Sequence, residues 1–328
     1  MPYPIVGLHH VTATVDEAQP DLDFCVEGLG LRLVKRTVNF DNHHVYHFYY
    51  GDERGTPGTI WTTFPYHGRG VPAGIKGDGQ ITVTSFSVPS GSLPFWSARL
   101  SELGLAVTEA QPRFGDQSLV VTDPSGLAIE LVATGRDERQ PWTGNDDVGF
   151  AHAVRGLHSV SMVIESPRQT IDLLTGVLGF ERVNEGEGRV RLAVNGDTPG
   201  RYLEIMHGSG APAARNGLGT VHHVALAIAG GDEQARLRAE LLGLGYQVTP
   251  FMDRQYFRSI YFREPGGVLL EVATMEPGFE VDEPRAELGR GLRLPPWEEA
   301  KRGEIEGGLA PIRVRTWTAP EAGSPVPS

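Results

Sequence analysis

Two consecutive histidine pairs and one carboxylate are the residues of this sequence best suited to chemistry. The pairs are His9-His10 near the start and His222-His223 in the second half, and Glu271 stands in the apolar run Val-Leu-Leu-Glu-Val-Ala. A carboxylate buried on an apolar strand must be paired with a cation or bound to a metal. Two imidazoles and one carboxylate on one face of a metal leave other positions open, as in the non-haem iron(II) oxygenases.

Internal repeats show how residues so far apart in the chain could meet. The segment Gly7-Leu8-His9-His10-Val11 recurs 149 residues later as Gly156-Leu157-His158-Ser159-Val160. A second segment, from Arg113 to Glu130, recurs 141 residues later from Arg254 to Glu271. These repeats define four modules, at residues 5–66, 78–135, 154–208 and 218–276. The first module resembles the third, and the second resembles the fourth.

Each module has the same predicted order of elements. An alternating strand opens it, a helical segment such as residues 92–103 or 232–242 follows, and strands bounded by glycine close it. The 42 glycines suit many short strands joined by tight turns. We therefore predict an α+β fold of four βαβββ modules, arranged as two similar domains. The predicted boundaries are a first domain at 1–135, a linker at 136–153, a second domain at 154–276 and a C-terminal tail at 277–328.

The repeats place the candidate ligands in equivalent strands. His10 and His223 occupy the same position in the opening strands of modules one and four, and Glu271 lies on the closing strand of module four. His223 and Glu271 belong to one module and can lie on neighbouring strands, whereas His10 must come from a module that faces them. We predict that His10, His223 and Glu271 bind one transition metal.

A second set of positions lacks this combination of residues. In the same registers the other modules hold Ser159, Thr82 or Val83, Glu130 and Glu204, with His158 one residue out of register. Because no imidazole is aligned there, we interpret this set as a vestigial pocket without a metal. Pairing with Arg113 is the simplest account of a buried Glu130.

The motifs around these residues resemble those of a known family. Gly-Leu-His-His-Val-Thr at 7–12, Val-His-His-Val at 221–224 and Gly-Gly-Val-Leu-Leu-Glu at 266–271 look like the vicinal-oxygen-chelate superfamily, which includes glyoxalase I, bleomycin-resistance proteins and extradiol dioxygenases. The resemblance spans about residues 5–300 and is closest to dioxygenases that cleave hydroquinone rings. It implies Fe2+ at His10, His223 and Glu271, with Mn2+, Zn2+ or Ni2+ as alternatives. It also implies a small aromatic substrate and O2 as partners.

The same resemblance implies residues around the metal. Those that would support the ligands or face the substrate are His9, Thr12, His222, Arg254 and Tyr261. Tyr261 and Arg254 would hold a second substrate hydroxyl or developing negative charge, and Thr12 would contact the substrate. His9 or His222 would serve as general acid or base, since imidazole titrates near neutral pH.

Residue patterns alone also favour plainer roles for these side chains. An aromatic residue flanked by apolar ones, as Tyr261 is, normally belongs to the core. Arg254 can pair with the adjacent Asp253 or with neighbours of Glu271. His9 and His222 alternate with the proposed ligands, so the period of a strand turns them to the opposite face.

Two other functions compete with the ring-cleaving dioxygenase. A metal-dependent isomerase or lyase of the glyoxalase type usually presents four protein donors with two glutamates, whereas the set here holds one glutamate. A ligand-sequestering protein of the bleomycin-resistance type lacks residues in the metal positions, whereas three are filled here. The sequence therefore favours an iron(II)-dependent dioxygenase acting on hydroquinone-type or catechol-type aromatics.

Composition argues against several further classes. The 29 Lys and Arg against 41 Asp and Glu give a net charge of −12, unlike a nucleic-acid binder or a polybasic membrane-surface protein. No apolar run is long enough for a transmembrane helix, and the N-terminus shows no secretory signal. The single cysteine, Cys25, excludes an intrachain disulfide, fits a cytoplasmic protein and is expected in the core.

Two expectations concern assembly and the C-terminal tail. We expect a homo-oligomer, with a dimer or a tetramer as the default. Leu294-Pro295-Pro296-Trp297 is expected to pack on the body of the protein, and residues 318–328 are expected to be disordered.

Overall fold

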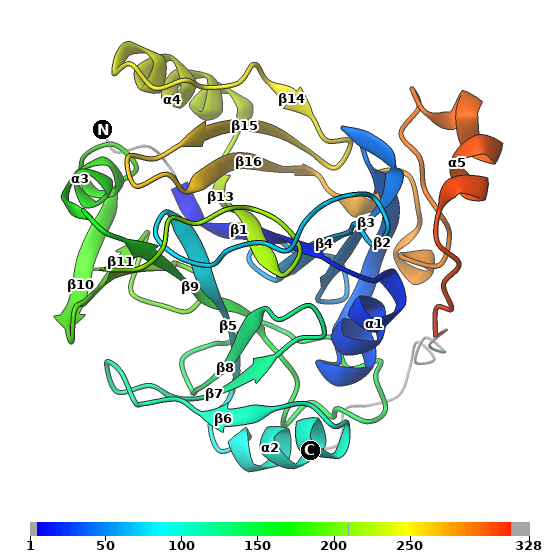
Figure 1. The fold of residues 1–328 in the computed structure, drawn as a ribbon, viewed down its shortest axis with the longest axis horizontal. Coiled ribbons are helices and arrows are strands. Elements are labelled where there is room, and N and C mark those ends of the chain that lie inside the picture. Colours follow the sequence, from blue (N-terminus) through cyan, green and yellow to red (C-terminus); the bar gives the residue numbers. More distant parts are fainter. Residues whose placement is uncertain (1–4, 209, 316–328) are drawn as a thin grey trace.

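The computed structural model of the chain describes residues 5–208 and 210–315, which form two eight-stranded sheets and peripheral helices (Figure 1). Module one holds β1 (Ile5–Val15), α1 (Ala18–Asp23) with a π-helical turn at Phe24–Gly28, β2 (Arg32–Asn39), β3 (Asn42–Gly51) and β4 (Ile60–Pro65). Module two holds β5 (Gln80–Pro89), α2 (Leu93–Glu102), β6 (Val107–Glu109), β7 (Gln117–Thr122) and β8 (Ala128–Thr134).

The second half of the chain repeats this order. Module three holds β9 (Gly156–Ile164), α3 (Arg168–Gly176), β10 (Phe180–Gly186), β11 (Arg189–Val194) and β12 (Tyr202–His207). Module four holds β13 (Thr220–Ile228), α4 (Gly231–Gly243), β14 (Met252–Asp253), β15 (Phe257–Arg263) and β16 (Leu269–Pro277). The predicted α+β fold of four βαβββ modules is therefore confirmed. None of the helices in the described ranges is both long enough and apolar enough to cross a membrane.

Each sheet combines one module from each half of the chain. One sheet has the strand order β14-β15-β16-β13-β1-β4-β3-β2, so it joins module four to module one. The other has the order β10-β11-β12-β9-β5-β8-β7-β6 and joins module three to module two. The opening strands form the junctions, because β1 pairs antiparallel with β13 and β5 pairs antiparallel with β9. A division of the chain into domains at residues 135 and 154 stays a prediction.

Two equivalent glycines let the opening strands approach neighbouring loops. Gly7 and Gly156 have φ values of +153° and +146°. A Cβ atom on Gly7 would lie 2.9 Å from the carbonyl oxygen of Gly200, and one on Gly156 would lie 2.9 Å from that of Gly58. The N–H groups that follow the two glycines donate to these same carbonyls, at 2.7 and 2.9 Å. The repeated glycine is therefore explained by a close backbone contact that a side chain would block.

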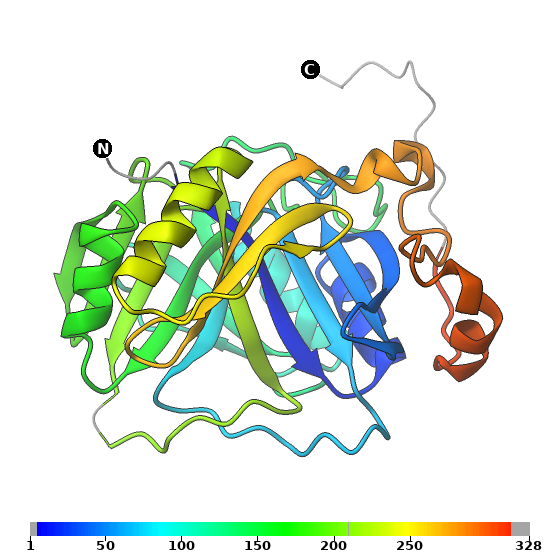
Figure 2. The ribbon, with the colours of Figure 1, turned by 90° about the horizontal axis from the view of Figure 1, so that it is seen from above.

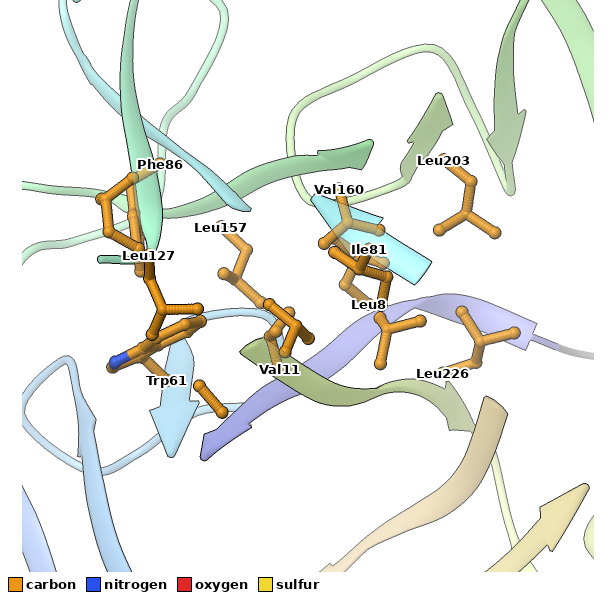
Figure 3. Close-up of a cluster of buried hydrophobic side chains, with 14 of the residues drawn as sticks. Leu8, Val11, Trp61, Ile81, Phe86, Leu127, Leu157, Val160, Leu203 and Leu226 are labelled. Carbon is orange, nitrogen blue, oxygen red and sulfur yellow. The ribbon is translucent and has the colours of Figure 1, made fainter. Parts of the chain in front are cut away.

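The main core lies between the two sheets. Side chains from both sheets meet there, among them Leu8, Val11, Trp61, Leu226, Ile81, Phe86, Leu157 and Val160 (Figure 3). Each of these side chains is at most 3% exposed. Strand alternation then directs His10 and Thr12 to the face of β1 opposite Val11, away from this core. That second face is where the candidate site forms.

The C-terminal segment runs along module one, beside β2 and β3 (Figures 1 and 2). It contains 3-10 turns at Phe279–Val281, Arg285–Glu287 and Glu299–Lys301, followed by α5 at Arg302–Gly308. Leu292 forms a bridge with Arg36 of β2, Leu294 is buried, and the ring of Trp297 lies 5.6 Å from that of Phe40. The expected contact of residues 294–297 with the body is therefore confirmed. The expected disordered end at 318–328 lies outside the described residues.

A buried acid, Asp21 of α1, lies beside Cys25, which is itself fully buried as expected. Asp21 is 2% exposed and accepts hydrogen bonds from Thr63 Oγ1 at 2.6 Å and from Tyr50 Oη at 2.8 Å. Burial raises the pKa of the Asp21 carboxyl from 3.8 to about 7, although both donors act to lower that pKa. The folded protein therefore keeps a proton on Asp21 that the unfolded chain releases at much lower pH.

We expect Asp21 to make the free energy of unfolding fall as the pH rises from about 4 to about 7, because only the folded state holds the proton in that window. Asp21→Asn keeps the shape and removes the ionisation. Above pH 7 this variant should be more stable than the wild type, by an amount on the order of 2–4 kcal/mol. Urea unfolding of both proteins across this pH range measures the difference, and parallel pH profiles would contradict the assignment.

Candidate metal centre

Strand pairing brings the three predicted ligands to one face of the sheet formed by modules one and four. Across the junction of β1 and β13, His10 pairs with Ala225 and Thr12 pairs with His223. On the other side of β13, Ala225 pairs with Glu271 of β16. Residues two apart on a strand share a face, so His10, His223 and Glu271 project from three adjacent strands toward one point.

The three donor atoms lie at distances typical of ligands on one metal. The Nε2 atoms of His10 and His223 are 3.3 Å apart. Glu271 Oε2 lies 3.2 Å from the first nitrogen and 2.8 Å from the second. Donors held about 2.1 Å from one ion and at right angles to each other lie about 3.0 Å apart. All three side chains are buried, so the structure brings the predicted set together in a protected position.

Protein groups satisfy only half of the Glu271 carboxylate. Its Oε1 accepts a hydrogen bond from Ser259 Oγ, whereas the buried Oε2 has no hydrogen-bond donor among the described residues. Burial acts to raise the pKa of Glu271, but the adjacent His10 and His223 side chains hold that pKa well below its usual range. A divalent cation between the three donors would also keep the carboxylate ionised and would satisfy Oε2. The residues present therefore fit a metal.

His9 determines which nitrogen of His10 faces this point. His9 Nε2 lies 3.2 Å from the carbonyl oxygen of Thr274, which can only accept, so that nitrogen carries the proton. Burial and the adjacent His10 lower the pKa of His9 to about 3, so the neutral ring has its lone pair at Nδ1. The Nδ1 atoms of His9 and His10 are 2.8 Å apart, and His10 must donate across that distance. Neutral His10 therefore has its lone pair at Nε2, toward the metal position.

His9 and His222 stand at bulges, so the expectation that they face away from the ligands is wrong. The pairing of β1 with β13 shifts register at each of them, and a bulge removes strict alternation locally. His222 Nδ1 lies 2.7 Å from His223 Nδ1, and its ring lines the cavity above the donors. The ring of His9 instead packs against His10 and Phe257. Of the two, His222 can contact a substrate and His9 supports a ligand.

A cavity of about 200 Å³ opens above the donor atoms. Tyr261 lines it, because β15 pairs Tyr261 with Glu271 and directs both to the same face. Its ring lies 5.7 Å from that of His223. The predicted residues Thr12 and Arg254 also line this cavity. The plainer expectation that Tyr261 belongs to the core is therefore wrong.

Arg254 crosses from module four to module one at the edge of the cavity. Its Nε donates to Tyr261 Oη at 3.1 Å, and its Nη1 lies 3.1 Å from Asp41 Oδ2. Asp41 belongs to the turn between β2 and β3, so pairing with the adjacent Asp253 is not the arrangement observed. Burial raises the pKa of the Tyr261 phenol well above its usual range, and the phenol therefore keeps its proton near neutral pH.

Several cavity residues were not predicted, and most come from module one. They are Asn39, Phe40, Asp41, His47, Tyr49, Phe64, Tyr66 and Phe257. His47 Nε2 lies 2.9 Å from Thr62 Oγ1, and that hydroxyl donates to Thr12 Oγ1 at 2.9 Å. Burial, with His10 nearby, holds the pKa of His47 well below its usual range, so the ring is neutral. The group of histidines at 43–47 is the sequence signal that could have identified this strand.

In the other sheet, arginines pair with the carboxylates at the equivalent place. Arg113 makes a bidentate contact with Glu130 and donates from Nε to Glu204 at 3.0 Å. Arg189 and Arg191 also contact Glu204. Burial acts to raise the pKa of Glu204, but these three cations lower it to about 2. The expected pairing of Glu130 with Arg113 is confirmed.

Register also settles which residue of the second sheet replaces each histidine. Val83, and not Thr82, stands in the register of His223, because Thr82 occupies a bulge. His158 occupies another bulge, at the position that His9 has in the first sheet. Both sheets therefore keep the bulges, and the first sheet alone has imidazoles at both ligand positions.

Comparisons with known proteins agree with this geometry. The sequence model of the Glyoxalase/Bleomycin resistance protein/Dioxygenase superfamily matches residues 156–272. MhqO of Bacillus subtilis (strain 168), which bears the name of a ring-cleaving dioxygenase, is 41% identical over 312 residues, or 94% of this chain and 97% of MhqO. The chain therefore belongs to this superfamily. A second relative, the chlorohydroquinone/hydroquinone 1,2-dioxygenase of Sphingobium indicum, is 34% identical over 93% of this chain and 96% of that enzyme.

Solved structures show the same fold. The crystal structure of a Bacillus subtilis protein described as a dioxygenase has a TM-score of 0.89 and 39% identity, covering 96% of this chain and 99% of that protein. Glyoxalase I of Zea mays has a TM-score of 0.60 at 13% identity, covering 82% of this chain and 92% of that protein. The expected vicinal-oxygen-chelate fold is thereby confirmed.

We expect Glu271→Gln to abolish stable metal binding, because a neutral amide replaces the charged donor. The matched change Glu130→Gln alters the equivalent strand position of the other sheet. It should leave metal content unchanged and lower Tm, since Arg113 loses a buried partner. Anaerobic metal analysis after loading with Fe2+ should give about one ion per chain for the wild type and for Glu130→Gln. Equal metal contents in the two variants would contradict the proposed centre.

We expect His9→Leu to weaken metal binding without changing the cavity lining, because His10 loses the acceptor that fixes its tautomer. Such outer hydrogen-bond partners contribute about 10- to 100-fold to metal affinity. Competition with a chelator for Mn2+ measures the effect, and His158→Leu at the equivalent bulge serves as the control. If His9→Leu bound Mn2+ as tightly as the wild type, the backbone alone would orient His10.

Proposed function

We propose that the protein is an iron(II)-dependent dioxygenase that cleaves the ring of a hydroquinone-type or catechol-type aromatic compound. The observation that carries this proposal is the buried set of two imidazoles and one carboxylate at the base of a small cavity. That ligand set, with positions left open, is typical of non-haem iron(II) oxygenases. Two relatives that match nearly the whole chain, one named as a ring-cleaving dioxygenase and one as a chlorohydroquinone/hydroquinone 1,2-dioxygenase, support the same assignment.

The cavity suits one aromatic ring. Its volume is about 200 Å³, and an apolar cavity of about 150 Å³ can hold benzene. Tyr49, Phe64 and Phe257 supply aromatic walls, while Thr12 and Tyr261 supply hydroxyl groups. A ring that carries hydroxyls is therefore better matched to this cavity than a purely apolar ring.

An isomerase of the glyoxalase type is less well supported, because the donor set lacks a second carboxylate. Thr62 pairs with Thr12 in the first sheet, as Glu204 pairs with Ser161 in the other. Thr62 therefore stands where a second glutamate would stand. Its hydroxyl donates to Thr12 and cannot act as the carboxylate base that proton transfer needs. A metal-free sequestering protein is disfavoured by the three donors that fill the metal positions.

When bound, iron would supply the transfer of electrons from the aromatic ring to O2. The protein groups bind and orient the substrate. Tyr261 Oη accepts from Arg254, which leaves its own proton for a substrate hydroxyl or for developing negative charge. Thr12 accepts from Thr62 and likewise retains its proton. Both hydroxyl groups can therefore donate a hydrogen bond to an oxygen of the substrate.

His222 has a related role at the cavity wall. Burial and the adjacent His223 lower the pKa of His222 to about 3, so the ring is neutral. If His223 presents Nε2 to the metal, its Nδ1 donates to His222 Nδ1. His222 then carries its proton on Nε2 and can donate it in a hydrogen bond to a substrate oxygen. His9 packs behind His10, so we assign it to ligand orientation and not to acid–base chemistry.

We expect the Fe2+-loaded protein to consume O2 when hydroquinone is added and the metal-free protein to consume none. At saturating Fe2+, Tyr261→Phe should lower kcat/KM by about 100-fold, because a donor to developing charge is lost. Tyr246→Phe, at a partly buried phenol outside the cavity, should behave as the wild type. Tight Zn2+ or Ni2+ with no O2 uptake on any hydroquinone or catechol would overturn the proposal and favour the isomerase.

A further inference from the structure

Arginines at the same repeat position of modules two and four point in different directions. Arg113 and Arg254 stand 141 residues apart, at equivalent places in the two modules. The two arginines stand in turns of the same conformation, because the residues that follow them, Phe114 and Gln255, have positive φ values of 53° and 65°. The N–H of each arginine also donates to the carbonyl three residues ahead, at 3.4 and 3.0 Å. The backbone therefore does not explain the different directions of the side chains.

In the sheet of modules two and three, the arginine forms an ion pair with the carboxylate. Arg113 contacts both oxygens of Glu130, the residue equivalent to Glu271. Ser118 Oγ donates to Oε1 of Glu130 at 2.6 Å and Ser85 Oγ to Oε2 at 2.5 Å. Both oxygens of that carboxylate are engaged, and neither is left for a metal.

In module four the arginine is held away from the carboxylate. Tyr261 Oη accepts from Arg254 Nε at 3.1 Å, and the Arg254 Cζ lies 5.2 Å from the centre of the Tyr261 ring. Asp41, from module one, holds Nη1 at 3.1 Å. The residue that pairs with Glu130 where Tyr261 pairs with Glu271 is Val120, which offers no acceptor. The phenol that accepts from Arg254 is therefore particular to the site with the histidines.

If nothing held the Arg254 side chain, its guanidinium group would be attracted to the Glu271 carboxylate. A bidentate contact between guanidinium and carboxylate is among the strongest hydrogen-bonded pairs in proteins. Glu271 Oε2 is buried and has no donor among the described residues, so it would gain most from such a contact. The guanidinium and the metal are thus alternative partners of one carboxylate.

We infer that Tyr261 and Asp41 are positioning residues that hold Arg254 off Glu271 and so keep the carboxylate available to the metal. This inference rests on the metal centre of the proposed function. It assigns to Tyr261 a second role besides substrate contact, and to Asp41 a role that the sequence did not indicate. Neither residue is itself a ligand.

The test measures Mn2+ affinity in four proteins. These are the wild type, Asp41→Asn/Tyr261→Phe, Arg254→Met, and the triple variant that combines all three changes. We expect the double variant to bind Mn2+ at least about 10-fold more weakly than the wild type. Arg254→Met in that background should restore binding to within about threefold of the wild type, because the competing cation is gone. Arg254→Met alone should bind at least as tightly as the wild type.

Restoration by a third substitution separates positioning from a general structural effect. If the double variant bound Mn2+ as the wild type does, or if the triple variant stayed weak, the inference would be wrong. A wild-type protein that bound no Mn2+ would instead reject the metal centre itself. Asp253→Asn/Tyr246→Phe is the matched control and should bind normally. Should the double variant not fold, Asp41→Asn alone, at a 65% exposed side chain, should weaken binding and Arg254→Met should restore it.

Discussion

The rest of the site depends on one constraint, which is that three donor atoms meet at a buried point where none of the described lysines or arginines contacts them. Among the described residues Glu271 Oε2 has no donor, and His9 directs the lone pair of His10 toward this point. Leaving a buried carboxylate oxygen without a donor or a cation is strongly unfavourable. The surrounding features either hold these atoms together, as Ser259 does, or keep a competing cation away, as Tyr261 does with Arg254.

The pairing of modules gives this constraint its place in the fold. Because the opening strands β1 and β13 lie side by side, one ligand comes from the start of the chain and two come from its last module. A cation bound at this point would therefore bridge residues more than 200 positions apart, and loop-closure arguments predict that such long-range links stabilise a fold. The glycine contacts at Gly7 and Gly156 join each opening strand to a loop of the other sheet, so the repeated glycine links the two sheets.

The repeat made much of this predictable from sequence. Equivalent positions in repeated modules have equivalent places in the sheets, so aligning His10 with His223 and placing Glu271 on a closing strand was enough to find the donor set. Strand alternation failed at His9 and His222, because a bulge adds one residue and no residue pattern marks it. The approach of the β2–β3 turn, which brings Asp41 to Arg254, arises from tertiary packing between modules and left no periodic signal.

The two sheets balance the negative charge of their buried carboxylates in different ways. In the second sheet, Glu130 and Glu204 meet the guanidinium groups of arginines, so carboxylates and cations neutralise each other within the protein. In the first sheet, a single carboxylate with two neutral imidazoles would leave a divalent ion with a net positive charge. That excess charge favours a deprotonated phenol, because a nearby cation lowers the pKa of an acid. With Thr62 in the register where a second glutamate would stand, a bound ion would keep more positive charge and have one donor fewer, which suits the hydroquinone-type substrate that we propose.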